Sequence, residues 1–225
     1  MIIAIDGGAA TGKTTIAKFL SKKINFLHLN SGLIYRGITH VLFENKFLNK
    51  NESFYKQFLK NINFEVTGDK YNVIRYNNEN ITNLLHDKYI AENISFVSDN
   101  AIIRDYITKL QRKISTNINV VCEGRDIGTV VFPFADYKFF LNADINVRVE
   151  RRYQQYLKNN IQIEKKQIKK MLIRRDHNDI NRQVSPLIKA KDAMKIDTTN
   201  KTVNEQIDII IEILNKGQIW HQKKI

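Results

Sequence analysis

Gly7–Thr14 reads GGAATGKT and matches the pattern G-x-x-x-x-G-K-[S/T]. It follows Met1–Asp6 (MIIAID), an apolar, β-branched run typical of a buried parallel strand. It precedes Thr14–Lys23, whose apolar residues recur at helical spacing. A strand, a glycine-rich turn and a helix in this order direct backbone N–H groups and the positive end of the helix at one place, which suits a phosphate. The stretch therefore predicts a phosphate-binding P-loop and an α/β fold of the P-loop NTPase kind.

Two side chains of this loop have expected roles toward a nucleotide. Lys13 would reach the β- and γ-phosphates of ATP, and the Thr14 hydroxyl would ligate Mg²⁺. The alternative is a glycine turn with an accidental lysine, which would make the flanking strand and helix a coincidence. The residues expected to bind ATP are Gly7, Gly8, Ala9, Ala10, Thr11, Gly12, Lys13, Thr14 and Thr15.

A second apolar strand pattern ends in an acid. Asn119–Arg125 reads NVVCEGR, and in P-loop proteins a carboxylate at such a strand end orients Mg²⁺ or its water. Glu123 is therefore a candidate metal residue that acts through water. The alternative is an acid that caps a helix or pairs with Arg125.

The composition is that of an ordinary globular chain. Its 225 residues are 43% hydrophobic and 26% charged, which allows one buried α/β core and a smaller accessory region. No apolar run approaches the ~20 residues of a membrane-spanning helix, and Met1–Asp6 is too short for a signal peptide. The one cysteine, Cys122, excludes an intrachain disulfide and fits a reducing compartment. We expect a cytoplasmic protein without a membrane partner.

The formal net charge of +13 raises the question of a nucleic-acid partner, because basic surfaces attract polyanions. However, the basic residues are spread along the whole chain, and we find no RNP-type aromatic motif, zinc-ligand spacing or separate basic arm. A protein that handles phosphates also needs many arginines. We therefore expect small-molecule partners and no nucleic acid.

Strand and helix patterns alternate along most of the chain. Further strands are predicted at Phe26–Asn30, Asn119–Glu123, Tyr137–Leu141 and Ala193–Asp197. Further helices are predicted at Asp99–Ser115, Asn146–Asn159 and Val203–Leu214. This alternation predicts a five-stranded parallel sheet with helices on both faces.

Two stretches depart from that alternation. Asn63–Glu79 alternates around the turn-prone Thr67-Gly68-Asp69, with Tyr71 on one side, which is typical of a hairpin. We therefore predict a small inserted antiparallel β subdomain over about 58–93. The polar, basic and glycine-free stretch 154–170 predicts a mobile helical arm.

Three spaced segments carry a resemblance that covers nearly the whole chain. They are Ser31–Arg36 (SGLIYR), Gly124–Pro133 (GRDIGTVVFP) and Arg175–Arg182 (RDHNDINR), which Ser185-Pro186-Leu187 follows. With the hairpin, which falls where that family carries an insert, they resemble the bacterial cytidylate kinases, a family of nucleoside monophosphate kinases. The resemblance implies a single P-loop kinase domain over 1–225. Its core would be about 1–57, 94–147 and 183–225, its insert 58–93 and its helical lid 148–182.

The resemblance also implies a reaction, ATP + CMP → ADP + CDP, with Mg²⁺ as cofactor and dCMP as a second acceptor. The acceptor is already a phosphate dianion, so no general base is needed, and positioning and charge neutralisation carry the rate. The expected catalytic residues are Lys13 and the lid arginines Arg148 and Arg152. Nothing demands more than a monomer.

The acceptor site of that family carries over to nine residues. Those that would grip the acceptor phosphate are Ser31, Arg36, Arg125 and Arg182, since guanidinium forks fit phosphate oxygens. Those that would read the cytosine are Ser95, Arg104 and Asp126, and those that would hold the sugar are Arg175 and Asp179. A carboxylate accepts from the exocyclic amine of cytosine but faces the O4 of uracil as a second acceptor, so rejection of UMP is expected.

Several of these residues have a plainer alternative. Ser95 could cap a helix that begins near Asp99. Arg104 and Asp126 could form a purely structural ion pair. A solvated basic face could account for Arg148, Arg151 and Arg152.

Three residues stand apart from the family pattern. His177 matches no role and is expected at the surface. Glu123 stands where the family usually has Asp, which makes its metal role less secure, and Gly8 stands where relatives often have proline, which adds backbone freedom. For the whole chain, the alternatives are a UMP- or AMP-directed kinase, a P-loop regulatory switch and a nucleic-acid-binding protein.

Overall fold

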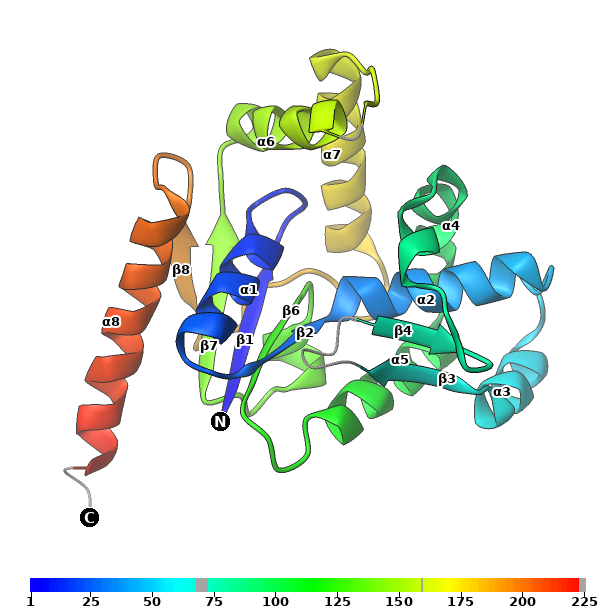
Figure 1. The fold of residues 1–225 in the computed structure, drawn as a ribbon, viewed down its shortest axis with the longest axis horizontal. Helices are drawn as coiled ribbons and strands as arrows, with labels where there is room; N and C mark the ends of the chain where they lie inside the picture. Colours follow the sequence, from blue (N-terminus) through cyan, green and yellow to red (C-terminus); the bar gives the residue numbers. More distant parts are fainter. Residues whose placement is uncertain (68–72, 159, 223–225) are drawn as a thin grey trace.

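The computed structural model describes residues 1–67, 73–158 and 160–222. Its centre is a five-stranded parallel sheet in the order β2-β6-β1-β7-β8 (Figure 1). The strands are β1 (Ile2–Gly7), β2 (Leu27–Asn30), β6 (Val120–Gly124), β7 (Tyr137–Asn142) and β8 (Met194–Asp197). This sheet confirms the predicted fold class, and each strand agrees with its predicted range to within one residue.

Helices cover both faces of the sheet, because successive residues of each buried strand point to opposite sides. Ile3 and Ile5 pack with helices α1 (Lys13–Lys23) and α8 (Val203–Gln222), whereas Ala4 packs on the opposite face. The helices that pack on this opposite face are α2 (Ser31–Glu44), α3 (Glu52–Asn61), α4 (Lys88–Asp99) and α5 (Ala101–Ile114).

A second, antiparallel sheet lies beside α2, as the sequence predicts for the insert. Its strands are β3 (Phe64–Thr67), β4 (Val73–Tyr76) and β5 (Glu79–Asn80), and a short 3₁₀ helix, η1 (Thr82–His86), follows. Gly37 of α2 makes room for it, because a Cβ there would lie 2.8 Å from Ile74 and Phe64. The predicted turn residues Gly68 and Asp69, and the predicted strand residue Tyr71, lie outside the described residues.

The predicted helix over 99–115 begins two residues later than expected. Asn100 caps it, with its side-chain oxygen accepting from the N–H groups of Ile102 and Ile103. Ser95 lies inside the preceding helix α4. The alternative that Ser95 caps this helix is therefore wrong, because Asn is an equally good cap and stands at the chain reversal itself.

The predicted arm over 154–170 is not one helix. Helix α6 (Ile145–Lys158) and helix α7 (Lys165–Asn181) are separate, with non-helical backbone over 160–164. They pack together through Val149, Ile168 and Leu172 and against Ala9 of the phosphate loop. Figure 1 shows α6 above α1 and α7 descending beside it toward the sheet. The predicted last residue of α6, Asn159, lies outside the described residues.

A short π-helical turn, η2 (Ile127–Val131), lies in the connection between β6 and β7. Within the described part of the chain, no helix combines the length and the apolar character that crossing a membrane requires.

Candidate active site

A cavity of about 810 Å³ opens at the carboxyl ends of β1, β2 and β6. Residues from both sheet faces and from α6 and α7 line it. Of the predicted site residues, those in its lining are Ala10, Thr11, Gly12, Lys13, Thr14, Thr15, Ser31, Arg36, Ser95, Arg104, Glu123, Arg125, Asp126, Arg152, Arg175, Asp179 and Arg182. Those outside the lining are Gly7, Gly8, Ala9 and Arg148. The fold thus brings residues from the whole length of the chain to one cavity.

The phosphate loop is a tight turn between β1 and α1. Gly7 has φ +150° and lies so close to β7 that a Cβ would meet the Leu141 carbonyl oxygen at 2.3 Å. Gly12 has φ +97°, a conformation that favours glycine. Lys13 is buried, and its Nζ donates to the Gly8 carbonyl oxygen at 2.6 Å. The loop therefore already curls around the ammonium group.

The charge state of Lys13 reflects that position. Burial, followed by the neighbouring Arg125, lowers the pKa of Lys13 well below its usual value, and Glu123 partly opposes the shift. A positive group held in a dry, partly cationic place is stabilised when an anion arrives. A nucleotide phosphate would supply that anion.

Thr14 and Glu123 meet at the edge of the loop. The Thr14 hydroxyl donates to Glu123 Oε2 at 3.0 Å. Glu123 stands opposite Ile5 of β1 in the sheet register, which brings the end of β6 to the loop. Arg125 instead donates to Asp179, at 2.8 Å. A hydroxyl and a carboxylate together are the oxygen donors that Mg²⁺ prefers, so these residues fit the expected metal.

Four guanidinium groups gather on the other side of the cavity. Burial, then Arg125, lowers the pKa of Arg175 to about 10, and Arg36 and Arg152 add to the shift. Burial also lowers the pKa of Arg152, and the neighbouring Arg125 lowers it further. Burial likewise lowers the pKa of Arg36, to which Arg152 contributes. Among the acids, Asp179 raises the pKa of Arg175 in part. All four side chains are half-buried, and an excess of positive charge in such a place suits an anion with several oxygens.

Two residues of this cluster have partners that fix them. Arg36 donates to the Leu85 carbonyl oxygen at 3.1 Å. Asp179 pairs with Arg125. Burial raises the pKa of Asp179, but Arg125, Arg175 and Arg182 together outweigh this and hold it below its usual value. Ser31 is the first residue of α2 and is buried at the cavity wall.

The three predicted base-reading residues line one end of the cavity. Arg104 and Asp126 are each 3% exposed and form an ion pair, so the plainer alternative is present. Arg104 also donates to the Ser98 carbonyl oxygen at 2.8 Å, and its guanidinium lies 5.3 Å from the Tyr35 ring centroid. Ser95 lies beside them in the cavity wall. The pair is therefore buried and tied to its surroundings, and it also borders the cavity.

Arg182 joins this end to the phosphate end. Its Nε donates to the Ser185 carbonyl oxygen at 2.7 Å. Its terminal nitrogens lie 3.8 Å from Asp126 and 3.7 Å from Asp179. One guanidinium group thus bridges the carboxylates predicted to contact base and sugar.

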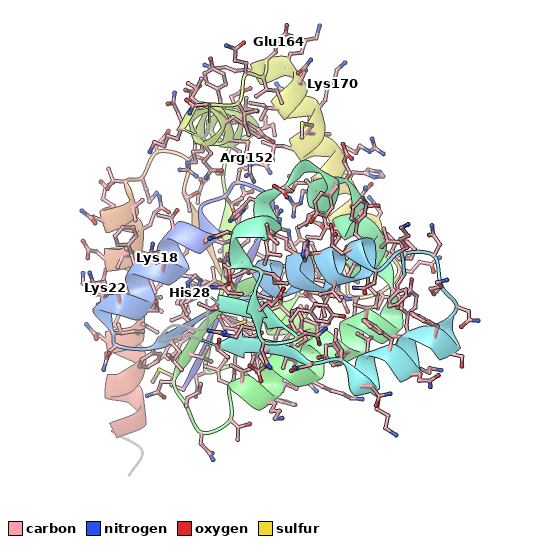
Figure 2. The ribbon with its side chains drawn as sticks, turned by 45° about the vertical axis from the view of Figure 1, so that its right-hand side comes forward. Lys18, Lys22, His28, Arg152, Glu164 and Lys170 are labelled. Atoms are coloured by element: carbon pink, nitrogen blue, oxygen red, sulfur yellow. The ribbon has the colours of Figure 1, made fainter. Side chains whose placement is uncertain are left out.

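Arg148, Arg151 and Arg152, on α6, do not form a solvated face. Arg151 donates to the Thr198 carbonyl oxygen at 2.6 Å. Arg152 is half-buried near Arg125, on the side of α6 that faces the rest of the protein (Figure 2). Arg148 pairs with Asp176 and donates to the Ala9 carbonyl oxygen at 3.2 Å. The expected neighbours Arg148 and Arg152 therefore differ, because only Arg152 reaches the cavity.

Asp176 is a residue that the sequence reasoning missed. Its Oδ1 accepts from the Ala9 N–H of the phosphate loop at 2.9 Å, and Gly8 leaves it room, since a Cβ there would lie 3.1 Å from Oδ1. Its place in the segment 175–182 was the only signal in the sequence. His177, next to it, is exposed, as expected.

Asp6, in β1, fixes the backbone next to the cavity. Both of its oxygens accept backbone N–H groups at 2.8 Å, from Ile127 and Gly128. Burial raises the pKa of Asp6 to about 6, against the effect of these two hydrogen bonds. The carboxyl group thereby ties β1 to the turn that follows Arg125 and Asp126.

The chain is similar in sequence to known proteins. A family model described as "Cytidylate kinase" matches residues 3–216. The chain is 43% identical over 216 residues to a cytidylate kinase of Fusobacterium nucleatum subsp. nucleatum, across 96% of this chain and 98% of the relative. It is 37% identical over 217 residues to one of Carboxydothermus hydrogenoformans, again across 96% and 98%.

A solved structure shares the fold. An uncharacterized protein from Eubacterium ventriosum ATCC 27560 is similar with a TM-score of 0.50 at 13% identity, across 96% of this chain and 98% of that one. At this identity the likeness concerns the fold alone.

Proposed function

Because the chain belongs to the cytidylate kinase family, we propose that it transfers the γ-phosphoryl group of ATP to CMP and dCMP, forming CDP and dCDP. The transfer is a direct, in-line displacement in which an acceptor phosphate oxygen attacks the γ-phosphorus and ADP leaves. It serves pyrimidine nucleotide metabolism in the cytoplasm, and the enzyme acts as a monomer.

One observation carries the proposal. A phosphate loop and a cluster of four arginines face each other across a single cavity, so the protein can hold two phosphate-bearing ligands end to end. A switch protein that binds one nucleotide would have no use for the second cluster. The pairing favours transfer between two nucleotides.

On the donor side, the backbone N–H groups of the loop cradle the β-phosphate of ATP. Lys13 leaves the Gly8 carbonyl and bridges the β- and γ-phosphates. Thr14, and Glu123 through water, are the residues that would hold magnesium, which when bound would supply charge neutralisation to the nucleotide phosphates.

On the acceptor side, the phosphate of CMP lies among the arginines. The residues that grip it are Ser31, Arg36, Arg125 and Arg182. Asp126, held by Arg104, accepts from the cytosine amine beside Ser95, and the sugar rests on Arg175 and Asp179. The ion pair holds the Asp126 carboxyl group in place as an acceptor, which is what selection of an amine over a carbonyl requires.

The lid supplies the remaining positive charge. Arg152 is close to Arg125 and Arg175 and neutralises charge on the transferred group. Arg148, on the same face of α6, acts through Asp176 and the phosphate loop. Closure of α6 and α7 excludes the water that would otherwise hydrolyse ATP.

A coupled ADP-release assay across CMP, dCMP, UMP, AMP and GMP tests the proposal. We expect turnover with CMP and dCMP, and kcat/KM for CMP about 100-fold or more above that for UMP, because uracil leaves buried polar groups unpaired. A preference for UMP or AMP would contradict the substrate. A rate of ADP release that is the same with and without every acceptor would contradict phosphoryl transfer.

A further inference from the structure

Behind the phosphate loop lies a buried histidine that the proposed mechanism does not use. His28, in β2, is 3% exposed and does not line the cavity. Figure 2 shows it beside helix α1. Within the described part of the chain, neither ring nitrogen has a hydrogen-bond partner. Buried polar groups are normally paired, so this one calls for an explanation.

The sheet register brings His28 to Glu123. In the parallel pair of β2 and β6, His28 stands opposite Val121 and Asn30 opposite Glu123. Val121 packs on the α1 face of the sheet, and residues two apart on a strand share a face, so His28 and Glu123 both point to that side. Their closest atoms, His28 Nε2 and Glu123 Oε1, are 3.4 Å apart.

The two side chains complete each other. Glu123 is also 3% exposed, and its Oε1 has no hydrogen-bond partner among the described residues. Movement of about 0.5 Å would turn the 3.4 Å contact into an ordinary hydrogen bond. The contact is attractive only when Nε2 carries a proton to donate, because a bare nitrogen would face the carboxylate with its lone pair.

The other carboxylate oxygen connects this pair to the loop. Glu123 Oε2 accepts the Thr14 hydroxyl proton at 3.0 Å. A threonine hydroxyl can ligate a cation only through its oxygen lone pairs, so its proton must point elsewhere. A carboxylate held on the far side of Thr14 provides that place. A glutamate has three rotatable side-chain bonds, and one hydrogen bond alone leaves it free to turn away.

We propose that His28 is a positioning residue: its Nε2–H holds the Glu123 carboxylate so that Glu123 takes the Thr14 proton and leaves the Thr14 oxygen free for the magnesium of a bound nucleotide. This inference rests on the proposed metal role of Thr14 and Glu123. His28 acts only through Glu123, since it does not reach the cavity. Groups in such a second layer tune metal affinity through the residues they orient.

The test measures how much magnesium strengthens nucleotide binding. Isothermal titration gives the Kd of ADP with Mg²⁺ and with EDTA, and the ratio of the two is the magnesium effect. His28→Leu and His28→Met, which keep an apolar bulk but no donor, should reduce that ratio about tenfold while leaving the Kd of metal-free ADP unchanged. His28→Gln, which keeps an N–H donor, should retain most of the ratio.

Two controls separate positioning from packing. His40→Leu removes another buried imidazole, one that contacts Tyr89 and lies outside the cavity lining, and should leave the ratio unchanged. In a Glu123→Ala background, His28→Leu should reduce the ratio no further, since the two residues act on one interaction. Circular dichroism and thermal melts establish that each variant is folded.

The outcomes decide the inference separately from the proposed function. Equal ratios in the wild type, His28→Leu and His28→Met would overturn the role of His28 while leaving the kinase and its metal in place. A loss that His28→Gln does not restore would assign the effect to packing and also overturn it. A wild type that binds ADP equally with Mg²⁺ and with EDTA would overturn the metal site on which the inference rests.

Discussion

At the scale of single residues, the loop 7–14 was the strongest prediction that the sequence allowed. Its pattern is local, so the sequence alone predicts that Lys13 and Thr14 lie in a phosphate loop between a strand and a helix. The structure adds what locality cannot supply. Ala9 and Asp176 are 167 residues apart, and nothing in either neighbourhood indicates that they meet.

Replacing Lys13 by alanine should lower kcat by about 10³-fold or more, since it removes the charge that follows the transferred group. The fold should persist, because a buried ammonium with a lowered pKa is not a source of stability. Stopped assays and circular dichroism measure the two. The exposed Lys18 of the same helix provides the matched control Lys18→Ala, which should turn over normally. Near-normal rates for Lys13→Ala would contradict the phosphate-loop mechanism.

Cytosine selection should depend on the ion pair at the base end. Asp126→Ala and Arg104→Met should each lower the ratio of kcat/KM for CMP to that for UMP by about tenfold or more, because the cytosine amine loses its acceptor or that acceptor loses its orientation. The KM for ATP should change much less. Unchanged selectivity in both variants would place cytosine recognition elsewhere.

Asp6 predicts a pH dependence of stability. Its folded-state pKa of about 6 lies above the ordinary value of 3.8, so the folded protein holds that proton more tightly than the unfolded chain. Its contribution is therefore fully present below about pH 4 and is lost as pH rises through 6. The full loss amounts to about 3 kcal/mol of unfolding free energy. Urea unfolding of the wild type and of Asp6→Asn at pH 4 and 7 measures this. The unfolding free energy of the wild type should fall between the two pH values by this contribution, and that of Asp6→Asn should lack this fall.

At the scale of elements, the main sheet followed from alternating patterns, whereas some boundaries did not. The divisions predicted at 58, 93 and 148 fall inside α3, α4 and α6, so each would cut a helix. Composition cannot show such ends, because tertiary packing and caps such as Asn100 decide them. The division of the chain into core, insert and lid remains a prediction.

The lid pair α6–α7 should depend on Asp176. Asp176→Ala removes the partner of Arg148 and the acceptor of the Ala9 N–H, so α7 loses its tie to the phosphate loop. We expect faster hydrogen exchange over 165–181 and a kcat about tenfold lower, since lid closure completes the site. His177→Ala, at the exposed neighbouring position, is the matched control. Unchanged exchange in Asp176→Ala would show that this contact does not hold the lid.

Arg152 and Arg148 should behave differently although they share a helix face. Arg152→Ala should lower kcat with little effect on the KM for CMP, because Arg152 lies with the arginines at the point of transfer. A normal kcat would contradict its catalytic role. Sequence spacing alone placed the two arginines together, and only the contact of Arg148 with Asp176 separates them.

At the scale of the whole molecule, the net charge of +13 attracts anionic substrates from solution before they bind. Raising the salt from about 0.05 to 0.5 M should reduce kcat/KM for CMP several-fold, because screening weakens long-range attraction. The kcat should change less, since the half-buried arginines of the cavity are screened less than exposed charges once the lid is closed. Stopped-flow or steady-state rates at several salt concentrations measure this, and an equal fall in kcat would contradict it.

The strand order β2-β6-β1-β7-β8 has a consequence for the protein's synthesis. β6 lies between the first two strands and pairs with both, yet it begins only at Val120. A nascent chain therefore emerges from the ribosome with β1 and β2 unable to pair with each other in their final places, and more than half of the protein must be made before the gap is filled. Because domains tend to fold as they emerge, these exposed strand edges are where a chaperone would bind first.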